Sequence, residues 1–218
     1  MCIRDSLKSN IKVISNPVAK ASSFAHPDIP GENGRYTLLA VSRLDNIQKR
    51  LDCLIRAFAQ IVNEMKDWDL KIIGDGPAKD ELQQLVAELR ISNRVHFVNS
   101  KLDISSEYTH AHLFAIPSVW EGFPNALAEA MSHGIPAVGF EKAPGVSNLI
   151  KNGETGWLAK EVNNHITLSH ALKEAMRNHK ERLKRGSQAI VKMAKYDPDT
   201  QYDRWADLLK ALLKDRTK

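Results

Sequence analysis

HLFAIPSVWEGFPNALAEAMSHGIPAVGF, residues 112–140, contains a strand, a loop, a helix and a second strand in succession. HLFAIP and IPAVGF are short apolar runs, as expected of strands that are buried on both faces. Between them, NALAEAMSH is rich in helix-forming residues and is followed by Gly134, a residue type common just after a helix. Two parallel strands need a crossover of this kind, so the stretch predicts one unit of a parallel sheet.

The same alternation of short apolar runs and amphipathic stretches continues along the chain. Helical spacing of apolar residues predicts a helix from Lys49 to Met65, and from His165 to Leu213 almost everything is expected to be helical. We therefore predict an α/β fold with a Rossmann-like parallel sheet, flanked by helices and followed by a helical tail. The six expected strands are YTLLAVS (36–42), DLKIIGDG (69–76), RVHFV (94–98), HLFAIP (112–117), IPAVGF (135–140) and GWLA (156–159).

Composition restricts the classes of function. The 218 residues carry a net charge of +5, which suits an anionic ligand but is too small to indicate nucleic acid. Cys2 and Cys53 form neither a disulfide framework nor a metal cluster. The first residues, MCIRDSLKSNIKVIS, lack the apolar stretch of a secretory signal, and no run approaches the ~20 apolar residues of a membrane span. We expect a cytoplasmic protein.

Ligands of open parallel sheets bind at the carboxyl ends of the strands, so the loops there are the candidate site. After the first strand, Arg43 and Lys49 bracket the turn into a helix. Two cations beside a helix N-terminus suit an anion, because the free amides and the helix dipole favour negative charge there. Solvated loop charges are the alternative. No Walker-type loop and no G-x-G-x-x-G follows the strand.

The loop after HLFAIP carries Glu121, and the helix that follows it carries Glu129 about one turn inside. Pro124 suits the first helical position and Asn125 a capping position. Both carboxylates are able to line one pocket, where they would accept hydrogen bonds from sugar hydroxyls. The alternative is a helix-start charge and an exposed helix residue, and local physics alone favours neither.

The order of these segments resembles the donor-binding C-terminal half of a retaining glycosyltransferase of family 4, with the two-domain architecture called GT-B. The resemblance covers residues 10–159 and rests on five segments: Arg43 with Lys49, GDGP, RVHFV, PSVWEGFPNALAEAMSHGIP and APGVSNLIKNGETGWL. It implies transfer of a sugar from a nucleotide-diphosphate sugar, such as a UDP- or GDP-sugar, in polysaccharide, lipopolysaccharide or glycolipid synthesis. No cofactor or bound metal is implied.

The resemblance also implies a role for each site residue. Arg43 and Lys49 would hold the diphosphate and neutralise the leaving group, and Glu121 would contact the donor sugar at the reacting face. Glu129 would bind the ribose hydroxyls, and the backbone near Leu102 would contact the base. Sugar and phosphate would be positioned by the backbone of Gly122, Phe123, Pro124 and Asn125.

The chain departs from the family pattern at Arg50, where a glycine commonly stands. We expect arginine to be tolerated there because it is a good helix former. Residues 1–9 fit no pattern and are interpreted as an alternative or non-native start, 10–195 as the donor domain and 196–218 as a crossover helix. The family's N-terminal acceptor domain is absent from these residues, so we expect weak nucleotide binding and little transfer by this chain alone.

Two other hypotheses remain open from the sequence. One is a non-catalytic nucleotide-binding module completed by a separate chain. The other is a different GT-B enzyme, such as a nucleotide-sugar epimerase, which the combined cations and glutamates disfavour. The basic tail would allow weak contact with the inner membrane face, although solvated helices explain it more simply. Trp120, Trp157 and Cys53 are expected to be packing residues, and the apolar stripe near Trp205 to be partly exposed. His96, His110 and His112 are expected to be core or edge residues rather than metal ligands.

Overall fold

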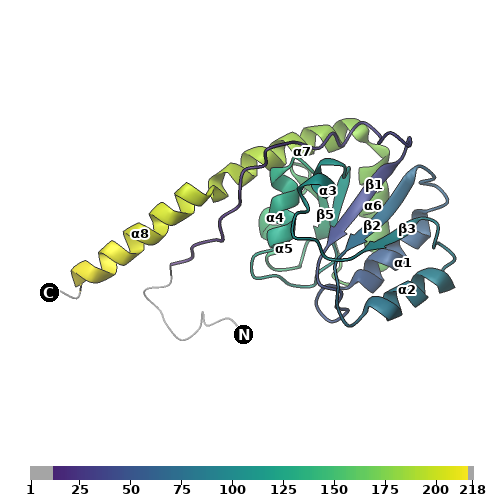
Figure 1. The fold of residues 1–218 in the computed structure, drawn as a ribbon, viewed down its shortest axis with the longest axis horizontal. Helices are drawn as coiled ribbons and strands as arrows, with labels where there is room; N and C mark the ends of the chain where they lie inside the picture. The colour runs from purple at the N-terminus through teal and green to yellow at the C-terminus, as the bar shows by residue number, and fades with distance from the viewer. Residues whose placement is uncertain (1–11, 216–218) are drawn as a thin grey trace.

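The computed structural model describes residues 12–215 and contains one sheet of six strands, all parallel (Figure 1). The predicted start at residues 1–9 lies outside the described residues. The strands occur in the order β3-β2-β1-β4-β5-β6. They are β1 (Tyr36–Val41), β2 (Trp68–Ile73), β3 (Val95–Val98), β4 (Leu113–Ile116), β5 (Ala137–Phe140) and β6 (Gly156–Ala159).

The helices follow the strands in the alternation that the sequence predicts. They are α1 (Leu51–Ile61), α2 (Lys79–Glu88), α3 (Ser105–Thr109), α4 (Asn125–Ser132) and α5 (Val146–Leu149). The helical tail consists of α6 (His165–Arg177), α7 (His179–Met193), the 3₁₀ turn η2 (Ala194–Tyr196) and α8 (Pro198–Asp215). The predicted α/β class and the helical tail are confirmed.

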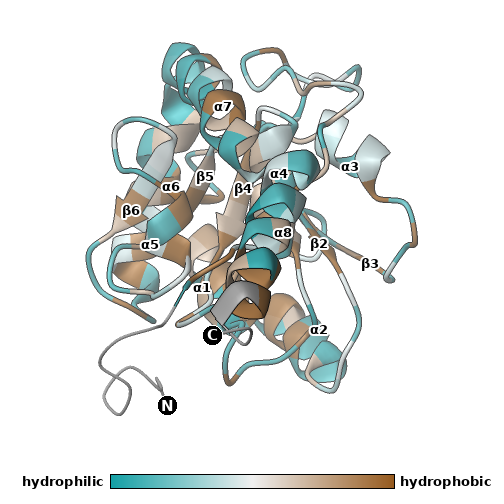
Figure 2. Ribbon diagram, turned by 90° about the vertical axis from the view of Figure 1, so that its left-hand side faces the viewer, coloured by the Kyte–Doolittle hydropathy of each residue, from teal (hydrophilic) through white to brown (hydrophobic). Residues whose placement is uncertain are grey.

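Helices cover the sheet on both faces, which explains why the strands are continuously apolar. On one face α6 packs against α1, β5 and β6, and α1 contacts α2. On the other face α4 and α5 pack against β5, and α7 packs against α4 (Figure 2). The core between these layers includes Leu38, Phe58 and Phe114, each at most 1% exposed.

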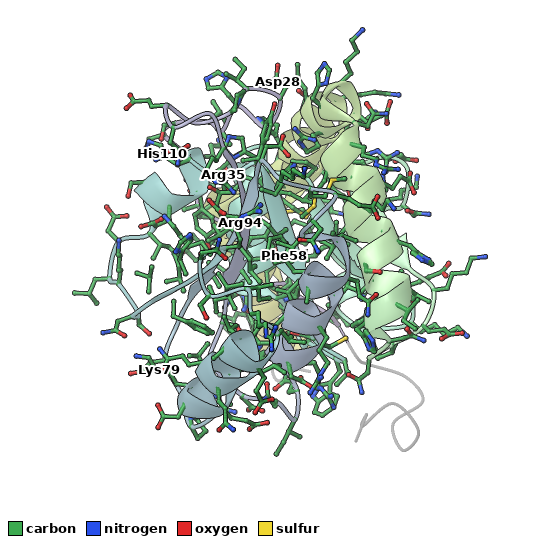
Figure 3. The ribbon with its side chains drawn as sticks, turned by 90° about the vertical axis from the view of Figure 1, so that its right-hand side faces the viewer. Asp28, Arg35, Phe58, Lys79, Arg94 and His110 are labelled. Carbon is green, nitrogen blue, oxygen red and sulfur yellow. The ribbon has the colours of Figure 1, made fainter. Side chains whose placement is uncertain are left out.

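The sheet edge at β2 and β3 is held by ion pairs. Arg35 donates to Asp69 from Nε at 2.5 Å and from Nη2 at 2.8 Å, and Arg94 Nε donates to the same carboxylate at 2.9 Å. Arg35 and Arg94 lie close together on this side of the molecule (Figure 3). Together they hold the pKa of Asp69 below its usual range, although its partial burial opposes this.

The tail and the N-terminal segment are joined near η2. The Val18 amide donates to the Tyr196 carbonyl at 2.8 Å, and the Ala25 amide donates to the His133 carbonyl at 2.8 Å. From there α8 projects away from the sheet (Figure 1). Its apolar stripe is exposed, as expected: Tyr202, Trp205, Leu209, Leu212 and Leu213 are each at least 50% exposed.

Arg50 corrects one prediction. The helix begins at Leu51 rather than Lys49, and Arg50 is its N-cap residue with φ 49° and ψ 44°. This is the left-handed region, which costs an L-residue roughly 1–2 kcal/mol and which glycine adopts freely. Helix propensity is therefore not the reason why arginine is tolerated. The Arg50 side chain instead bonds Asp52, with Nη2 to Oδ2 at 2.7 Å.

Two further expectations were wrong. Pro124, not Asn125, is the N-cap residue of α4, and Asn125 is its first helical residue. Trp120 is 49% exposed and is not a packing residue, whereas Trp157 is buried as expected. The Trp157 ring lies under the Arg185 guanidinium at 3.8 Å, and its Nε1–H donates to Glu174 at 3.0 Å.

The expectation of a buried, unreactive thiol at Cys53 is supported by the structure. Burial raises the pKa of Cys53 to about 12. Within residues 12–215, no helix combines the length and the apolar character that crossing a bilayer requires.

Arg182 is a charged residue inside the core, at 1% exposure. Its Nε–H donates to the Pro27 carbonyl at 2.7 Å, and Nη1 donates to the carbonyls of Ala175 and Met176 at the end of α6 at 3.1 and 2.5 Å. The guanidinium also lies 4.8 Å from the ring centres of both Tyr36 and Trp68. One side chain thus caps a helix and joins three segments.

Replacing Arg182 with methionine is expected to lower the free energy of unfolding by about 3 kcal/mol, because three buried carbonyls lose their donor. Urea unfolding measures this. Arg177→Met is the matched control, since Arg177 makes an exposed pair with Glu64 at 2.9 Å, and such pairs contribute about 0–1 kcal/mol. Equal effects of the two changes would contradict the assignment.

We expect the buried side chain of His112 to make the stability of the fold depend on pH. It is buried; Nδ1 accepts from the Thr37 amide at 2.8 Å and Nε2–H donates to the Ile29 carbonyl at 2.8 Å. Burial lowers its pKa to about 4. The unfolded state, with a pKa near 6.5, therefore binds the proton more tightly, and stability falls as the pH drops from about 6.5 toward 4.

Between pH 7 and pH 5 we expect His112 to account for a loss of about 2 kcal/mol. Urea unfolding at the two pH values measures the loss, and an NMR titration of the imidazole identifies its source. An imidazole that titrates near pH 6.5 in the folded protein would contradict this prediction.

Candidate functional site

Three adjoining cavities lie along the carboxyl edge of the sheet. The β1–β4 cavity, about 300 Å³, is lined by residues following β1 and β4, including Lys49 and Glu121. The β1–β2 cavity, about 400 Å³, lies beside Arg43 and Gly74. The α3–α4 cavity, about 590 Å³, contains Glu129. Shared lining residues, such as Asn125, Ala126 and Ile104, connect the three cavities into one groove.

The position of this groove follows from the strand order. The chain passes from β1 to β2 and β3 on one side, and then returns to β4 on the other side of β1. The loops leaving β1 and β4 therefore diverge, and open α/β sheets bind ligands in the crevice that this reversal creates. The β1–β4 cavity lies at this switch point.

Lys49 and Glu121 face each other across the switch point. Lys49 Nζ lies 2.6 Å from Glu121 Oε1, and their side chains are 21% and 9% exposed. The pair joins the loop after β1 to the loop after β4. A charge pair that is partly shielded from water interacts more strongly than one on the open surface, so it fixes both side chains.

Backbone contacts hold Glu121 in place from two sides. The Val119 amide donates to the Gln48 carbonyl at 3.0 Å, and Gln48 Nε2 donates to the Trp120 carbonyl at 2.9 Å. On the other side the Glu121 amide donates to the Pro144 carbonyl at 2.8 Å. Gly145 packs directly against the Glu121 backbone, because a Cβ atom on residue 145 would lie 2.2 Å from the Glu121 carbonyl oxygen. Three loops thus meet at Glu121.

Arg43 lines the β1–β2 cavity and is paired with Asp45. The other Asp45 oxygen accepts from the amides of Ile47 at 2.8 Å and Gln48 at 3.3 Å, and these amides hold the pKa of Asp45 below its usual range. Asp45 thereby shapes the loop that carries both cations. Arg43 and Lys49 line neighbouring cavities, and each faces a carboxylate rather than the other cation.

Glu129 and Leu102 both line the α3–α4 cavity, and Leu102 is fully exposed. The carboxylate of Glu129 accepts a hydrogen bond from the Tyr108 hydroxyl at 2.9 Å. Part of the N-terminal segment, residues 16–22, forms another wall of this cavity.

The start of α4 separates the β1–β4 cavity from the α3–α4 cavity. Phe123 and Pro124 line the former, and Asn125 lines both. Asn125 Oδ1 accepts from Asn16 at 3.0 Å, and the Phe123 ring lies 5.4 Å from Tyr196 of η2. The first-turn amides of α4 have no partner within the helix, so they are available to an anion.

The structure therefore brings most of the proposed residues together. The connected groove is lined by Arg43, Lys49, Glu121, Glu129 and the start of α4. Gly122, in the loop between Glu121 and α4, lines none of these three cavities. The two glutamates line adjoining cavities that share Asn125. Within residues 12–215, no group of three His, Cys, Asp or Glu side chains has the arrangement of a metal site.

Sequence reasoning missed Asp45, Gln48, Tyr108 and Gly145. Asp45 could have been recognised from the sequence. An aspartate in a loop commonly accepts a hydrogen bond from the backbone amide two residues further along the chain. Gln48 and Tyr108 carried no such signal, since their partners are 73 and 21 residues away along the chain.

Comparison with known proteins decides the family. The family model described as Glycosyl transferases group 1 matches residues 23–192. The chain belongs to this family. Its parallel sheet, flanking helices and helical C-terminal tail match the C-terminal domain of GT-B glycosyltransferases.

Relatives of this glycosyltransferase domain include an uncharacterized glycosyltransferase of Haemophilus influenzae, 34% identical over 127 residues, or 58% of this chain and 36% of the relative. The amylovoran biosynthesis glycosyltransferase AmsD of Erwinia amylovora is 27% identical over 202 residues, or 92% of this chain and 56% of AmsD. The crystal structure of Anabaena HepE with UDP-glucose is similar at a TM-score of 0.74 and 26% identity, covering 81% of this chain and 49% of HepE. The chain thus spans less than two thirds of each protein.

Gly145→Ala tests how the Glu121 loop is held. The change is expected to lower the free energy of unfolding by about 2 kcal/mol more than Gly153→Ala does. Both glycines have left-handed φ values, 82° and 81°, but a Cβ at Gly153 meets no atom within 4 Å. Both alanines therefore share the backbone penalty, and only the first collides with Glu121. Equal losses in urea unfolding would contradict the proposed support.

Proposed function

We propose that this glycosyltransferase group 1 domain is the donor-binding half of a retaining, family 4 enzyme that uses a nucleotide-diphosphate sugar. The observation that carries the proposal is the Lys49–Glu121 pair, a cation and a carboxylate 2.6 Å apart across the switch point between β1 and β4. The HepE structure with UDP-glucose supports a UDP-sugar as the first donor to test. AmsD supports a product of the polysaccharide or glycoconjugate class.

In our proposal the donor lies along the groove, from the α3–α4 cavity to the β1–β4 cavity. The nucleoside would occupy the α3–α4 cavity, with its ribose hydroxyls donating to Glu129 and its base near the backbone at Leu102. The diphosphate would lie between Arg43, Lys49 and the first amides of α4. The sugar would then lie next to Glu121, whose carboxylate accepts from sugar hydroxyls.

Transfer breaks the bond between the anomeric carbon and the oxygen of the β-phosphate, and that oxygen keeps the electron pair. An acceptor hydroxyl forms the new bond, and its proton passes to the departing phosphate oxygen. When configuration is retained, the hydroxyl approaches from the face that the phosphate leaves. Arg43, Lys49 and the α4 amides stabilise the charge that develops on the diphosphate, so our proposal includes no metal or other cofactor.

On binding, the donor would replace the carboxylates that now pair with Arg43 and Lys49. Without a ligand, Glu121 and Asp45 neutralise the two cations, which keeps the positive charges from facing each other unpaired. A diphosphate that takes over Lys49 frees the Glu121 carboxylate, which then accepts hydrogen bonds from the sugar. Binding of phosphate and binding of sugar are thereby linked through one ion pair.

The acceptor side of the proposal extends beyond these residues. A saccharide or lipid-linked acceptor would be bound with the help of a further domain of the GT-B architecture. We also propose a cytoplasmic location with contact at the inner membrane face through α7 and η2. Lys180 and Lys184 of α7 and Lys195 of η2 are exposed there, together with Leu183 and Val191.

Calorimetry with UDP tests the diphosphate site. Lys49→Met is expected to weaken binding roughly 10-fold or more, because a charge-assisted contact is lost. The unpaired Glu121 would add repulsion, so the double variant Lys49→Met with Glu121→Gln separates the two effects. Lys173→Met is the matched control, since Lys173 pairs with Glu64 away from the groove at 2.7 Å.

Two results would contradict the proposal. Absence of binding to UDP, GDP, ADP and their sugars would remove the donor site altogether. Equal affinities of Lys49→Met and Lys173→Met would leave a nucleotide site but exclude Lys49 from it.

A further inference from the structure

Glu129 is a half-buried carboxylate on the wall of the α3–α4 cavity. Within residues 12–215, the hydrogen bond from the Tyr108 hydroxyl, 2.9 Å to Oε2, is the only one that its carboxylate accepts, and no cation lies within ion-pairing distance. A glutamate side chain has three rotatable bonds, so binding a ligand through it normally costs the entropy of ordering them. Here Oε2 is already held, while Oε1 accepts no hydrogen bond from the part of the chain that the structure describes.

The tyrosine that holds this oxygen is rigid. Tyr108 lies in α3 at 2% exposure, with its ring 6.4 Å from Phe114 and 5.0 Å from His133. His133 is itself fixed, because its Nδ1–H donates to the Glu129 carbonyl at 2.9 Å. The Tyr108 ring therefore leaves its hydroxyl little freedom to follow a moving carboxylate.

The hydroxyl is a permanent donor. Burial raises the pKa of Tyr108 far above its usual range, and the negative charge of Glu129 raises it further. The Ala126 carbonyl, at 3.4 Å, is the other acceptor within reach. The single proton favours Glu129, because the carboxylate is nearer and charged.

We propose that Tyr108 is a positioning residue: its hydroxyl fixes the Glu129 carboxylate so that the other oxygen faces the cavity and accepts from a ribose hydroxyl. This inference rests on the proposed function, in which Glu129 binds the ribose. Tyr108 itself contributes no ribose contact in this arrangement. It acts by removing the alternative orientations of Glu129 before the nucleotide arrives.

The test is the preference for ribose hydroxyls rather than affinity alone. Calorimetry would compare UDP with 2′,3′-dideoxy-UDP for the unchanged chain and for Tyr108→Phe. We expect the unchanged chain to prefer UDP roughly 10-fold or more. In Tyr108→Phe this preference should fall by roughly threefold to tenfold, with the affinity for the dideoxy compound nearly unchanged.

Three further variants complete the experiment. Tyr36→Phe removes a hydroxyl that donates to the Asp28 carbonyl at 3.3 Å, remote from the groove, and should leave the preference intact. Glu129→Gln, alone and combined with Tyr108→Phe, completes a double-mutant cycle, in which the losses of ribose preference in the two single variants should be less than additive. Thermal unfolding of every variant reports whether the fold is kept.

The outcomes separate this inference from the proposed function. A ribose preference that is unchanged in a folded Tyr108→Phe protein overturns the role of Tyr108 alone. A chain that binds UDP and its dideoxy analogue equally overturns the ribose role of Glu129, and the Tyr108 inference with it. Equal weakening of both nucleotides by Tyr108→Phe indicates a merely structural role and also overturns the inference.

Discussion

The reversal of strand order between β1 and β4 is the constraint on which the groove depends. Because β1 pairs with β2 on one side and with β4 on the other, the loops that leave β1 and β4 run in opposite directions. One backbone hydrogen bond, from the Val119 amide to the Gln48 carbonyl, joins the two loops, and side chains bridge the rest of the space between them. Lys49, Gln48 and Glu121 do so, and this places charged groups where a parallel sheet offers a ligand its widest opening.

The positive charges of Arg43 and Lys49 in the groove are balanced before any ligand is present. Each of the two cations lies against a carboxylate, and these carboxylates are fixed by backbone amides or neighbouring loops. An anionic ligand therefore competes with groups that already occupy the correct geometry. This arrangement costs some affinity but removes the repulsion that unpaired cations would create in a partly buried site.

The fold was predictable from the sequence because its signal is local. Six apolar runs separated by amphipathic stretches require a parallel α/β sheet, and the strands and helices occur in the predicted order. The candidate site was predictable only in part. Arg43, Lys49, Glu121 and Glu129 were predictable because their charged side chains suit the ligand. The role of Arg50 depends on its backbone angles, and the exposure of Trp120 depends on the path of its loop, and neither can be seen in the sequence. Gln48 and Tyr108 act on partners distant in sequence, which no local pattern reveals.

Gly145 shows that a site depends on where its reactive groups are placed as well as on which groups are present. It contributes no functional atom, yet the Glu121 loop rests on the space where its side chain would be. A related chain that keeps both glutamates and both cations but carries a larger residue here would have the same reactive groups in a different arrangement. A comparison of their charged residues alone would treat the two chains as equivalent, although the residue at position 145 makes their sites different.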